Sequence, residues 1–274
     1  MVLNFSLRTQ SLTIAMFEPQ NDLERSLMKA ATDPSHRPQF HRDLLASDVY
    51  FVNAGDESLD VQDGVLQPGS NIPMQSWQRD GEEWLPIFSS LPRLQQSLQA
   101  EAKYLQLNAR SFFEITRGAN VILNPDLEYG KEFTATEIDV MLDGSIFRAG
   151  QGYTVQQDTQ VLLGQPAEYP TALVNALTRL FAQQRTVKAA YLAHLFNPAR
   201  DECPHTLIGI EVADDWDSIV GDAGMVAKET LLENEIVDFV RVTVGEAGVS
   251  RYMLHETKPF YRKSFLRNLF RWNE

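Results

Sequence analysis

The sequence predicts a mixed α/β (α+β) fold in two domains, on three observations. The chain has 274 residues, and at roughly 150 residues per domain this length suggests about two domains. Strand-like and helix-like segments alternate from 83 to 142, as in a layered α/β domain. After a Gly- and Gln-rich stretch at 143–159, the remaining segments follow the order β-α-β-β-α-β, which predicts a ferredoxin-like C-terminal domain.

These patterns divide the chain into four parts. We expect a non-native or disordered extension at 1–15, an N-terminal α/β domain at 16–145, a C-terminal domain at 158–257, and a basic aromatic tail at 258–274. The extension is set apart because Ser, Thr and Gln interrupt its apolar residues. It has neither the continuous apolar run nor the A-x-A site of a signal peptide.

Helical spacing opens the first domain. Leu23, Leu27 and either Ala30 or Ala31 fall on one face of a helix at 21–31, and Asn21 or Asp22 is suited to cap it. The rest of this domain is predicted to contain a helix after Pro38, strands at 48–54, 60–66, 82–90, 103–108 and 120–125, and helices at 91–102, 109–118 and 134–142.

Two details of these elements follow from residue type. Pro86 lies within the strand at 82–90, and because proline has no N–H to donate, it indicates an edge or a bulge. Thr134 or Thr136 is expected to cap the helix at 134–142, where Glu137 favours the positive end of the helix dipole.

The second domain is predicted from stronger apolar runs. We expect strands at 160–166, 187–196, 205–213 and 236–244, and helices at 169–184, 214–229 and 247–256.

Charge and composition exclude several classes of protein. The net charge of −13 argues against nucleic acid as a partner, because binding to phosphates needs clustered Lys and Arg. No apolar run approaches the ~20 residues that span a bilayer, so no transmembrane segment is expected. One cysteine cannot form an internal disulfide, which fits a cytoplasmic protein.

The segment 121–133, VILNPDLEYGKEF, raises the question of a phosphate-binding loop. That motif needs a glycine five residues before Gly130 and Ser or Thr after Lys131, but the sequence has Pro125 and Glu132. Asn-Pro is instead a turn signal, so we expect a strand, a turn and the lead into a helix. A recognition loop is the alternative, with Tyr129 and Lys131 as its exposed contacts.

Other reactive residues give no catalytic or metal-binding pattern. Cys203 stands beside Asp201 and Glu202, which disfavour a thiolate, so we interpret it as a loop cysteine without a role. His36 and His41 are five residues apart, unlike paired zinc ligands on a helix. The carboxylates of 214–218 suit a helix start. We therefore expect no catalytic residues, no metal and no cofactor.

The C-terminal tail departs from the acidic average. It carries five cations and no acid between 257 and 273, and its apolar residues would form a stripe on a helix. The tail is predicted either to dock on its own acidic body or to bind a partner or a membrane surface. The candidate contacts are Phe260, Tyr261, Arg262, Lys263 and Arg267.

Several segments resemble one known family. The segments 23–52, 85–98 and 109–138 resemble the N-terminal domain of the SseB family, and 189–196, 205–212 and 258–263 resemble its C-terminal domain. The Leu-Asn-Pro turn with the following Gly-Lys-Glu-Phe is the most specific part. The resemblance extends over about residues 17–265.

What this resemblance implies is modest. The family is named for enhanced serine sensitivity in enterobacteria, and its genes are known beside a rhodanese-type sulfurtransferase. The resemblance brings no catalytic residues with it. It suggests a bacterial accessory or regulatory protein of sulfur or amino-acid metabolism that binds a protein partner, with a sulfurtransferase as the candidate. A small-molecule-binding sensor is the alternative, and an enzyme with a dispersed site is the third reading.

The interpretation of Cys203 can be checked directly. Cys203→Ser should leave the melting temperature and partner binding nearly unchanged. The acidic neighbours of the thiol disfavour its thiolate form, and the sequence pattern places no activating base beside it. Thermal unfolding and thiol labelling at neutral pH measure both properties. Fast, selective labelling together with loss of function would instead assign the thiol a role as a sulfur carrier.

Overall fold

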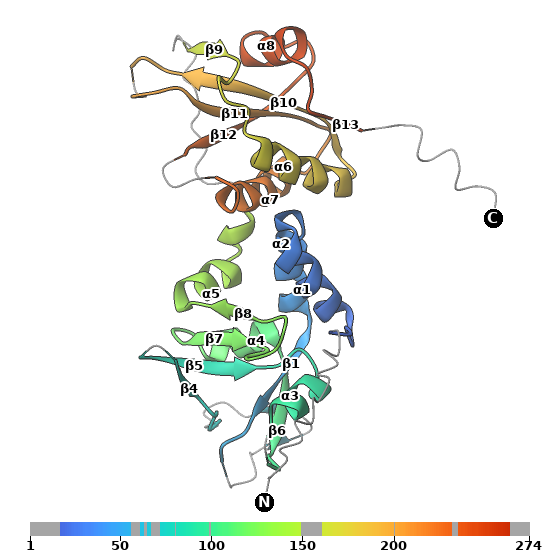
Figure 1. Ribbon diagram of the computed structural model, residues 1–274, viewed down its shortest axis with the longest axis vertical. Coiled ribbons are helices and arrows are strands. Elements are labelled where there is room, and N and C mark those ends of the chain that lie inside the picture. Colours follow the sequence, from blue (N-terminus) through green and yellow to red (C-terminus); the bar gives the residue numbers. More distant parts are fainter. Residues whose placement is uncertain are drawn as a thin grey trace, which may run out of the picture.

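The computed structural model of the protein describes residues 17–55, 61–62, 65–66, 72–79, 81–98, 100–148, 161–199, 201–231 and 235–263. Figure 1 shows two mixed units of helices and strands, one above the other, and so confirms the α/β fold class in two domains. The expected extension at 1–15 and most of the stretch at 143–159 lie outside the described residues.

Two helices and a short 3-10 turn open the N-terminal domain: α1 (Asp22–Thr32), η1 (Pro34–His36) and α2 (Arg37–Ala46). The side chain of Asn21 accepts a hydrogen bond from the backbone N–H of Glu24, so Asn21 is the cap of α1. Leu23, Leu27 and Ala30 are buried, which confirms the predicted face of this helix.

A four-stranded sheet lies beneath these helices, in the order β4 (Trp77–Arg79), β5 (Glu82–Ile87), β7 (Asn120–Leu123) and β8 (Lys131–Phe133). Strands β5 and β7 are parallel, and the other two pairs are antiparallel. Pro86 has a partner only on the side of β7, because pairing with β4 ends at Trp84. Strand β5 is therefore an interior strand and not the edge strand that Pro86 suggested, and Pro86 is accommodated because it lies beyond the residues that pair with β4. Strand β8 was not predicted, since three residues are too few for a pattern.

The remaining elements of this domain surround the sheet. They are β1 (Asp48–Val52), β2 (Val61–Gln62), β3 (Val65–Leu66), α3 (Leu91–Ser97), β6 (Tyr104–Asn108), α4 (Ala109–Ile115), α5 (Ala135–Leu142) and η2 (Ser145–Phe147). Strands β1 and β6 form an antiparallel pair. Thr134 caps α5 by accepting from the N–H of Glu137, as one of the two predicted threonines. The core between helices and strands includes Phe40, Phe112 and Phe133.

The C-terminal domain has three layers. Its elements are β9 (Leu162–Gly164), α6 (Thr171–Gln183), β10 (Val187–Phe196), β11 (His205–Val212), α7 (Trp216–Lys228), β12 (Val237–Arg241), α8 (Val249–Glu256) and β13 (Tyr261–Arg262). Helices α6 and α7 cover one face of the sheet and α8 the other (Figure 1). Burial on both faces explains the nearly continuous apolar run of β10.

The strand order of this sheet differs from the ferredoxin-like order that was predicted. The elements occur in the expected sequence, but β11 and β12 are adjacent and parallel, joined by α7 as a simple βαβ crossover. A split arrangement would place another strand between them. Strand β9 instead pairs with the end of β10, on the edge that β13 also occupies. The order of elements alone does not distinguish these two pairings.

The beginning of the basic tail is a short strand, β13. Tyr261 and Arg262 pair with Ala190 and Ala189 of β10. Phe181 of α6 stacks on Phe260 at 6.3 Å between ring centroids. The first residues of the tail therefore belong to the domain, and the predicted apolar stripe from Phe265 onward lies outside the described residues.

The two domains meet where α2, η1 and η2 contact α6 and α7. Nη2 of Arg42 lies 2.5 Å from Oδ1 of Asp222, and Nε2 of Gln184 donates to Oδ2 of the same carboxylate at 3.1 Å. Asp222 is only 2% exposed. Burial raises the pKa of its carboxyl group, and the bonds from Arg42 and Gln184 offset only part of that effect.

Other contacts bring the two backbones close together. Arg37 pairs with Glu229, and Nε of Arg179 lies 2.7 Å from Oδ2 of Asp33. A Cβ atom placed on Gly221 would lie 1.9 Å from the carbonyl oxygen of Phe147, so only glycine fits at this point of α7. The domain contact therefore depends on close packing as well as on charge.

The Arg42–Asp222 pair gives a stability prediction. Arg42→Met should lower the free energy of unfolding by about 2–3 kcal/mol, because a buried carboxylate loses its charged partner; the partial exposure of Arg42 keeps the loss below that of a fully buried pair. Asp222→Asn should cost less, since it removes the buried charge itself. Urea unfolding at pH 7 measures both.

The matched control is Arg25→Met, which breaks an exposed pair with Asp22 and should cost less than about 0.5 kcal/mol. Equal losses for Arg42→Met and Arg25→Met would show that the interdomain pair does not hold the domains together.

Candidate functional site

The Leu-Asn-Pro turn lies at the carboxyl ends of the parallel strands β5 and β7. Asn124 is fully buried with a left-handed backbone (φ 51°). Its Oδ1 accepts from the N–H of Ser89 at 2.9 Å, and its Nδ2 donates to Oγ of Ser89 at 2.8 Å. One side chain thus ties the end of β7 to the end of β5, which confirms the structural turn that the sequence favoured.

A buried carboxylate, Glu24 of α1, connects this hydrogen-bonded turn to helices α1 and α3. Its Oε1 accepts hydrogen bonds from the hydroxyls of Ser89 and Ser90, each at 2.8 Å, and Arg93 of α3 donates to its Oε2. Burial works to raise the pKa of Glu24, but the bonds from Arg93, the Gln20 N–H and the two serines outweigh it and hold the pKa below 4.5. Glu24 was not among the residues expected from the sequence, because it looks like any glutamate on a helix surface.

Gly130 completes the loop for a steric reason. A Cβ atom at this position would lie 2.8 Å from the carbonyl oxygen of Asn124 and 2.9 Å from that of Leu123. The glycine therefore lets the returning chain pass against the turn and enter β8. The role of Gly130 is to allow the two backbone segments to approach each other closely.

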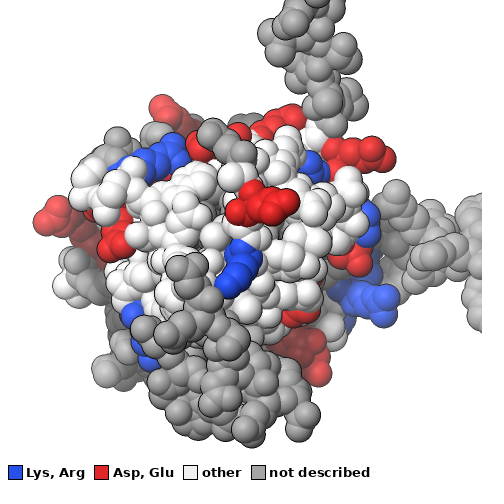
Figure 2. Space-filling model, turned by 90° about the horizontal axis from the view of Figure 1, so that it is seen from below, with Lys and Arg blue, Asp and Glu red and all other residues white. Residues whose placement is uncertain are grey.

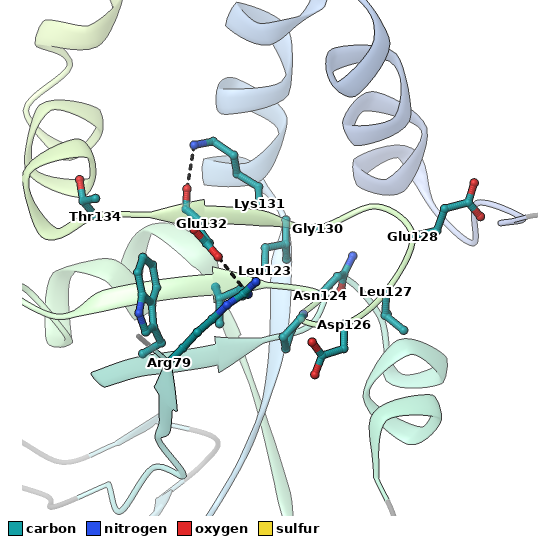
Figure 3. Close-up of a pocket in the computed structure, with 13 residues that line it drawn as sticks. Arg79, Leu123, Asn124, Asp126, Leu127, Glu128, Gly130, Lys131, Glu132 and Thr134 are labelled. Atoms are coloured by element: carbon teal, nitrogen blue, oxygen red, sulfur yellow. Dashed lines mark hydrogen bonds and ion pairs between the residues drawn. The ribbon is translucent and has the colours of Figure 1, made fainter. Parts of the chain in front are cut away.

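Figure 3 shows the shallow pocket of about 660 Å³ beside this loop. Arg79 and Glu132 form an ion pair there, with 2.9 Å between Nη1 and Oε1. Lys131 points to the opposite side of β8, toward α5, where its Nζ lies 3.0 Å from Oε1 of Glu137. The alternation along β8 thus sends two neighbouring charges into two different spaces.

The second space is a groove between the domains, which we call the interdomain groove. It consists of two adjoining cavities of about 270 and 660 Å³, and His41, Lys131, Glu137 and Glu229 line both of them. Glu229 follows α7 of the C-terminal domain, whereas the other three belong to the N-terminal domain. The groove therefore exists only when the two domains are in contact.

His41 is the most buried ionisable side chain of this groove, at 5% exposed. Its Nδ1 lies 2.8 Å from the carbonyl oxygen of Arg37, which can only accept, so Nδ1 carries the proton. Its Nε2 is buried without a hydrogen-bond partner among the described residues and lies 3.7 Å from Oε1 of Glu137.

The carboxylate of Glu137 is kept ionised by its surroundings. Burial works to raise its pKa, but the His41 ring and the Lys131 ammonium outweigh burial and hold the pKa of Glu137 below its ordinary value. His41 was considered in the sequence only as a zinc ligand. The signal that could have placed it in the groove is its position beside the inward residues Phe40 and Leu44, which share its side of α2.

The predicted contact residues fall in two separate places. Tyr129 belongs to the loop and Lys131 begins β8, but Tyr129 is half-buried and packs edge-to-face on Phe17, with ring centroids 5.0 Å apart. Phe260 and Tyr261 pack on Phe181 within the C-terminal domain. Their aromatic rings therefore support the fold, and the contact role proposed for them stays a prediction.

Arg262 and Lys263 lie in a group of four cations that we call the basic cluster. Arg185, Lys188 and Arg262 are exposed, and Lys263 is half-buried. The N–H of Lys263 donates to the carbonyl oxygen of Lys188 at 2.8 Å, and its ammonium donates to that of Arg185. Arg185 and Lys188 were not expected from the sequence, because only the pairing of β13 with β10 brings them next to the tail. Arg267 lies outside the described residues.

The face of the N-terminal domain in Figure 2 differs from this cluster. On its described residues, basic and acidic side chains are interspersed over a largely uncharged surface. In the basic cluster four cations lie close together, with Glu211 of β11 as the acid beside them, 3.9 Å from Nζ of Lys188.

The remaining residues with reactive side chains that the sequence drew attention to include Cys203 and His205. Cys203 is exposed in the loop between β10 and β11. Nε2 of His205 lies 2.9 Å from Oδ2 of Asp238 and so connects the parallel strands β11 and β12. Among the described residues, no group of three or more His, Cys, Asp or Glu side chains is arranged to hold a metal ion.

Comparison with known proteins decides the family. Residues 23–139 match the SseB protein N-terminal domain, and residues 155–263 match the SseB protein C-terminal domain. The chain belongs to the SseB family. It is 33% identical to Protein SseB of Escherichia coli (strain K12) over 257 residues, which cover 92% of this chain and 97% of that protein. Protein SseB of Shigella flexneri gives the same values.

No solved structure matches the chain. Within the described residues, no helix of this SseB family protein is both long and apolar enough to span a membrane. The matches to both SseB domains confirm the family resemblance that was inferred from the loop and the two domains.

The Glu24 network predicts how stability depends on pH. A carboxyl whose pKa is lowered by folding stabilises the fold above its unfolded pKa, and this stabilisation is lost as the pH falls through the folded value. The wild-type protein should therefore lose stability below about pH 4.5. Glu24→Gln should be roughly 2–3 kcal/mol less stable at pH 7 and lose less on acidification.

Urea unfolding at several pH values from 7 to about 3 measures this difference. Glu114→Gln, at an exposed position of α4, is the matched control and should follow the wild-type curve. If Glu24→Gln also runs parallel to wild type, the buried network does not contribute to acid lability.

Proposed function

We propose that this SseB family protein is a non-catalytic accessory or regulatory protein that acts by binding another protein. The observation that carries the proposal is the basic cluster of Arg185, Lys188, Arg262 and Lys263, on a chain whose net charge is −13. Cations gathered on one rigid edge of an acidic protein favour encounter with an acidic surface.

The backbone holds this cluster in a fixed arrangement. Strand β13 pairs with β10, and hydrogen bonds from Lys263 close the edge at Lys188 and Arg185. Charges on a paired strand lose little conformational freedom on binding, so they discriminate partners better than charges on a loose chain. The sequence continues from this point with Arg267 and Arg271, which extends the positive charge beyond the described residues.

The partner proposed is a rhodanese-type sulfurtransferase or another enzyme of sulfur or amino-acid metabolism, in the cytoplasm. Tyr129, Lys131, Phe260, Tyr261 and Arg267 remain proposed contacts. Support for this role comes from the family to which the chain belongs and from the charge of the C-terminal edge. A second candidate function, a small-molecule-binding sensor, is favoured by the interdomain groove with its unpaired histidine nitrogen.

The basic cluster gives a binding prediction. Changing Arg185, Lys188 and Arg262 together to Gln should slow association with the partner at least about tenfold at low salt and flatten the salt dependence of that rate. Stability should change by less than about 1 kcal/mol, as for other surface charges. Affinity capture from cell extract with mass spectrometry identifies the partner, and surface plasmon resonance with the purified partner gives the rates.

A control variant removes the same charge elsewhere. Arg25, Lys29 and Arg110 are exposed on the N-terminal domain, and changing these three to Gln should leave the association rate nearly unchanged. If both triple variants associate at the same rate, net charge and not the cluster directs binding, and the proposed surface is wrong. Binding of the wild type to anionic lipid vesicles instead of protein would also overturn the proposal.

A further inference from the structure

The carboxylates that line the interdomain groove are already neutralised by cations of the protein. Glu137 pairs with the ammonium group of Lys131, and Glu229 pairs with Arg37. Each pair joins one acid and one base, so the two pairs together add no net charge to the groove. The charge that a ligand would meet therefore depends on the other side chains of the larger cavity.

Two of these side chains, Arg148 and Lys228, are exposed cations that line the larger cavity. Arg148 donates to the backbone carbonyl oxygen of Asp143 at 3.3 Å. Within the described part of the chain, neither Arg148 nor Lys228 forms an ion pair with a carboxylate. On a chain whose net charge is −13, two unmatched positive charges in one cavity attract an anion to that place.

The backbone places these two cations at opposite ends of one stretch of α7. A Cβ atom on Gly221 would lie 2.9 Å from the backbone nitrogen of Arg148, so Arg148 lies against that turn of the helix. Lys228 follows Gly221 by two helical turns, ~10.5 Å along the axis and on the same side of α7. Long side chains that start this far apart can both contact one anion between them.

The floor of the cavity between the two cations is open. Gly224 lies on the same stretch of α7, and a Cβ atom added to it would meet nothing within 4 Å. Three apolar side chains line the cavity around this opening, namely Val140, Ile146 and Met225. The space beside the cations therefore suits the carbon chain of a ligand.

Charge and hydrogen-bond donors select the chemistry of that ligand. A phosphate monoester carries a charge of about −1.5 to −2 at pH 7, which matches two unpaired cations. Its oxygens can accept from a guanidinium, from an ammonium group, and from the hydroxyls of Thr136 and Ser145, which also line the cavity. A ligand with only an ammonium group would be repelled, and a neutral ligand would leave both cations unmatched.

The size and lining of the cavity limit the rest of the molecule. Its volume of about 660 Å³ is in the range of small-molecule sites. Among the described residues that line it, no Phe, Tyr or Trp offers a face on which a nucleotide base could stack. A short aliphatic phosphate therefore suits the cavity better than a nucleotide.

We propose that the interdomain groove binds a small aliphatic phosphate monoester, with its phosphate group between Arg148 and Lys228 and its carbon chain over Gly224. This inference rests on the second candidate function, the small-molecule-binding sensor, and is independent of the basic cluster. Arg148 follows η2 of the N-terminal domain, whereas Lys228 ends α7 of the C-terminal domain. One bound ligand thus contacts both domains and stabilises the contact between them.

Titration calorimetry of the full chain at low salt tests the ligand chemistry. Glycerol 3-phosphate should bind saturably, inorganic phosphate should bind more weakly, and glycerol should give no signal. Added salt should weaken binding, because the main contacts are between charges. If glycerol 3-phosphate does not bind, the groove is not such a site. If inorganic phosphate binds equally well, the carbon chain makes no contact and the monoester assignment is wrong.

Charge variants test the position of the phosphate group. Arg148→Gln and Lys228→Gln should each weaken the binding of glycerol 3-phosphate at least about tenfold, as expected for the loss of a charge-assisted hydrogen bond. The matched control is Lys29→Gln, because Lys29 is an exposed lysine in the last turn of α1, as Lys228 is in the last turn of α7. Equal weakening by Lys228→Gln and Lys29→Gln would show that net charge, and not this site, governs binding.

A steric variant tests the cavity without changing any charge. Gly224→Leu fills the open floor and should abolish binding, while leucine favours a helix more than glycine does and so keeps α7 intact. Glycerol 3-phosphate should raise the melting temperature of the wild type but not of Gly224→Leu. Wild-type affinity in Gly224→Leu would overturn the proposal. The partner-binding role is measured separately with the basic-cluster variants, so the two proposals fail independently.

Discussion

The hydrogen bonds between Asn124, Ser89 and Glu24 are the interaction on which the rest of the N-terminal domain depends. Strands β5 and β7 are parallel, so their carboxyl ends lie side by side and leave polar backbone groups that need partners. Asn124 satisfies the N–H of Ser89, and Glu24 gathers two serine hydroxyls and Arg93. This polar network is satisfied throughout, which is the condition under which buried polar groups support a fold.

The hydrogen-bonded turn at Asn124 also determines where the side chains of Lys131 and Glu132 point. The left-handed turn at Asn124 and the close approach at Gly130 bring the chain back as β8, and the alternation of β8 then sends Lys131 to the interdomain groove and Glu132 to Arg79. A loop of a different shape would move Lys131 away from Glu137. The most specific part of the family resemblance is thus the part that orients the groove.

The two domains are joined by contacts of a different kind. Asp222 is buried against Arg42, although burial disfavours the ionised form of its carboxyl group. Gly221 lets α7 approach the backbone of Phe147. Buried ion pairs contribute little net stability but strongly disfavour misaligned arrangements. They therefore suit a junction whose geometry defines the interdomain groove, while the basic cluster at the far sheet edge remains available to a partner.

The sequence by itself determined the class of fold, the α-helices of the described residues and the longer strands, the caps Asn21 and Thr134, and the family. These features depend on local periodicity and on short-range hydrogen bonds, which neighbouring residues specify. Strand order in the C-terminal sheet, the pairing of β13, and the meeting of His41 with Glu137 were decided only by the tertiary structure. Each of these features joins residues that are distant in the chain, and a single sequence contains no local signal for such contacts. The order β-α-β-β-α-β permits more than one arrangement of strands in a sheet. Arg185 becomes a neighbour of Lys263 only when β10 and β13 pair.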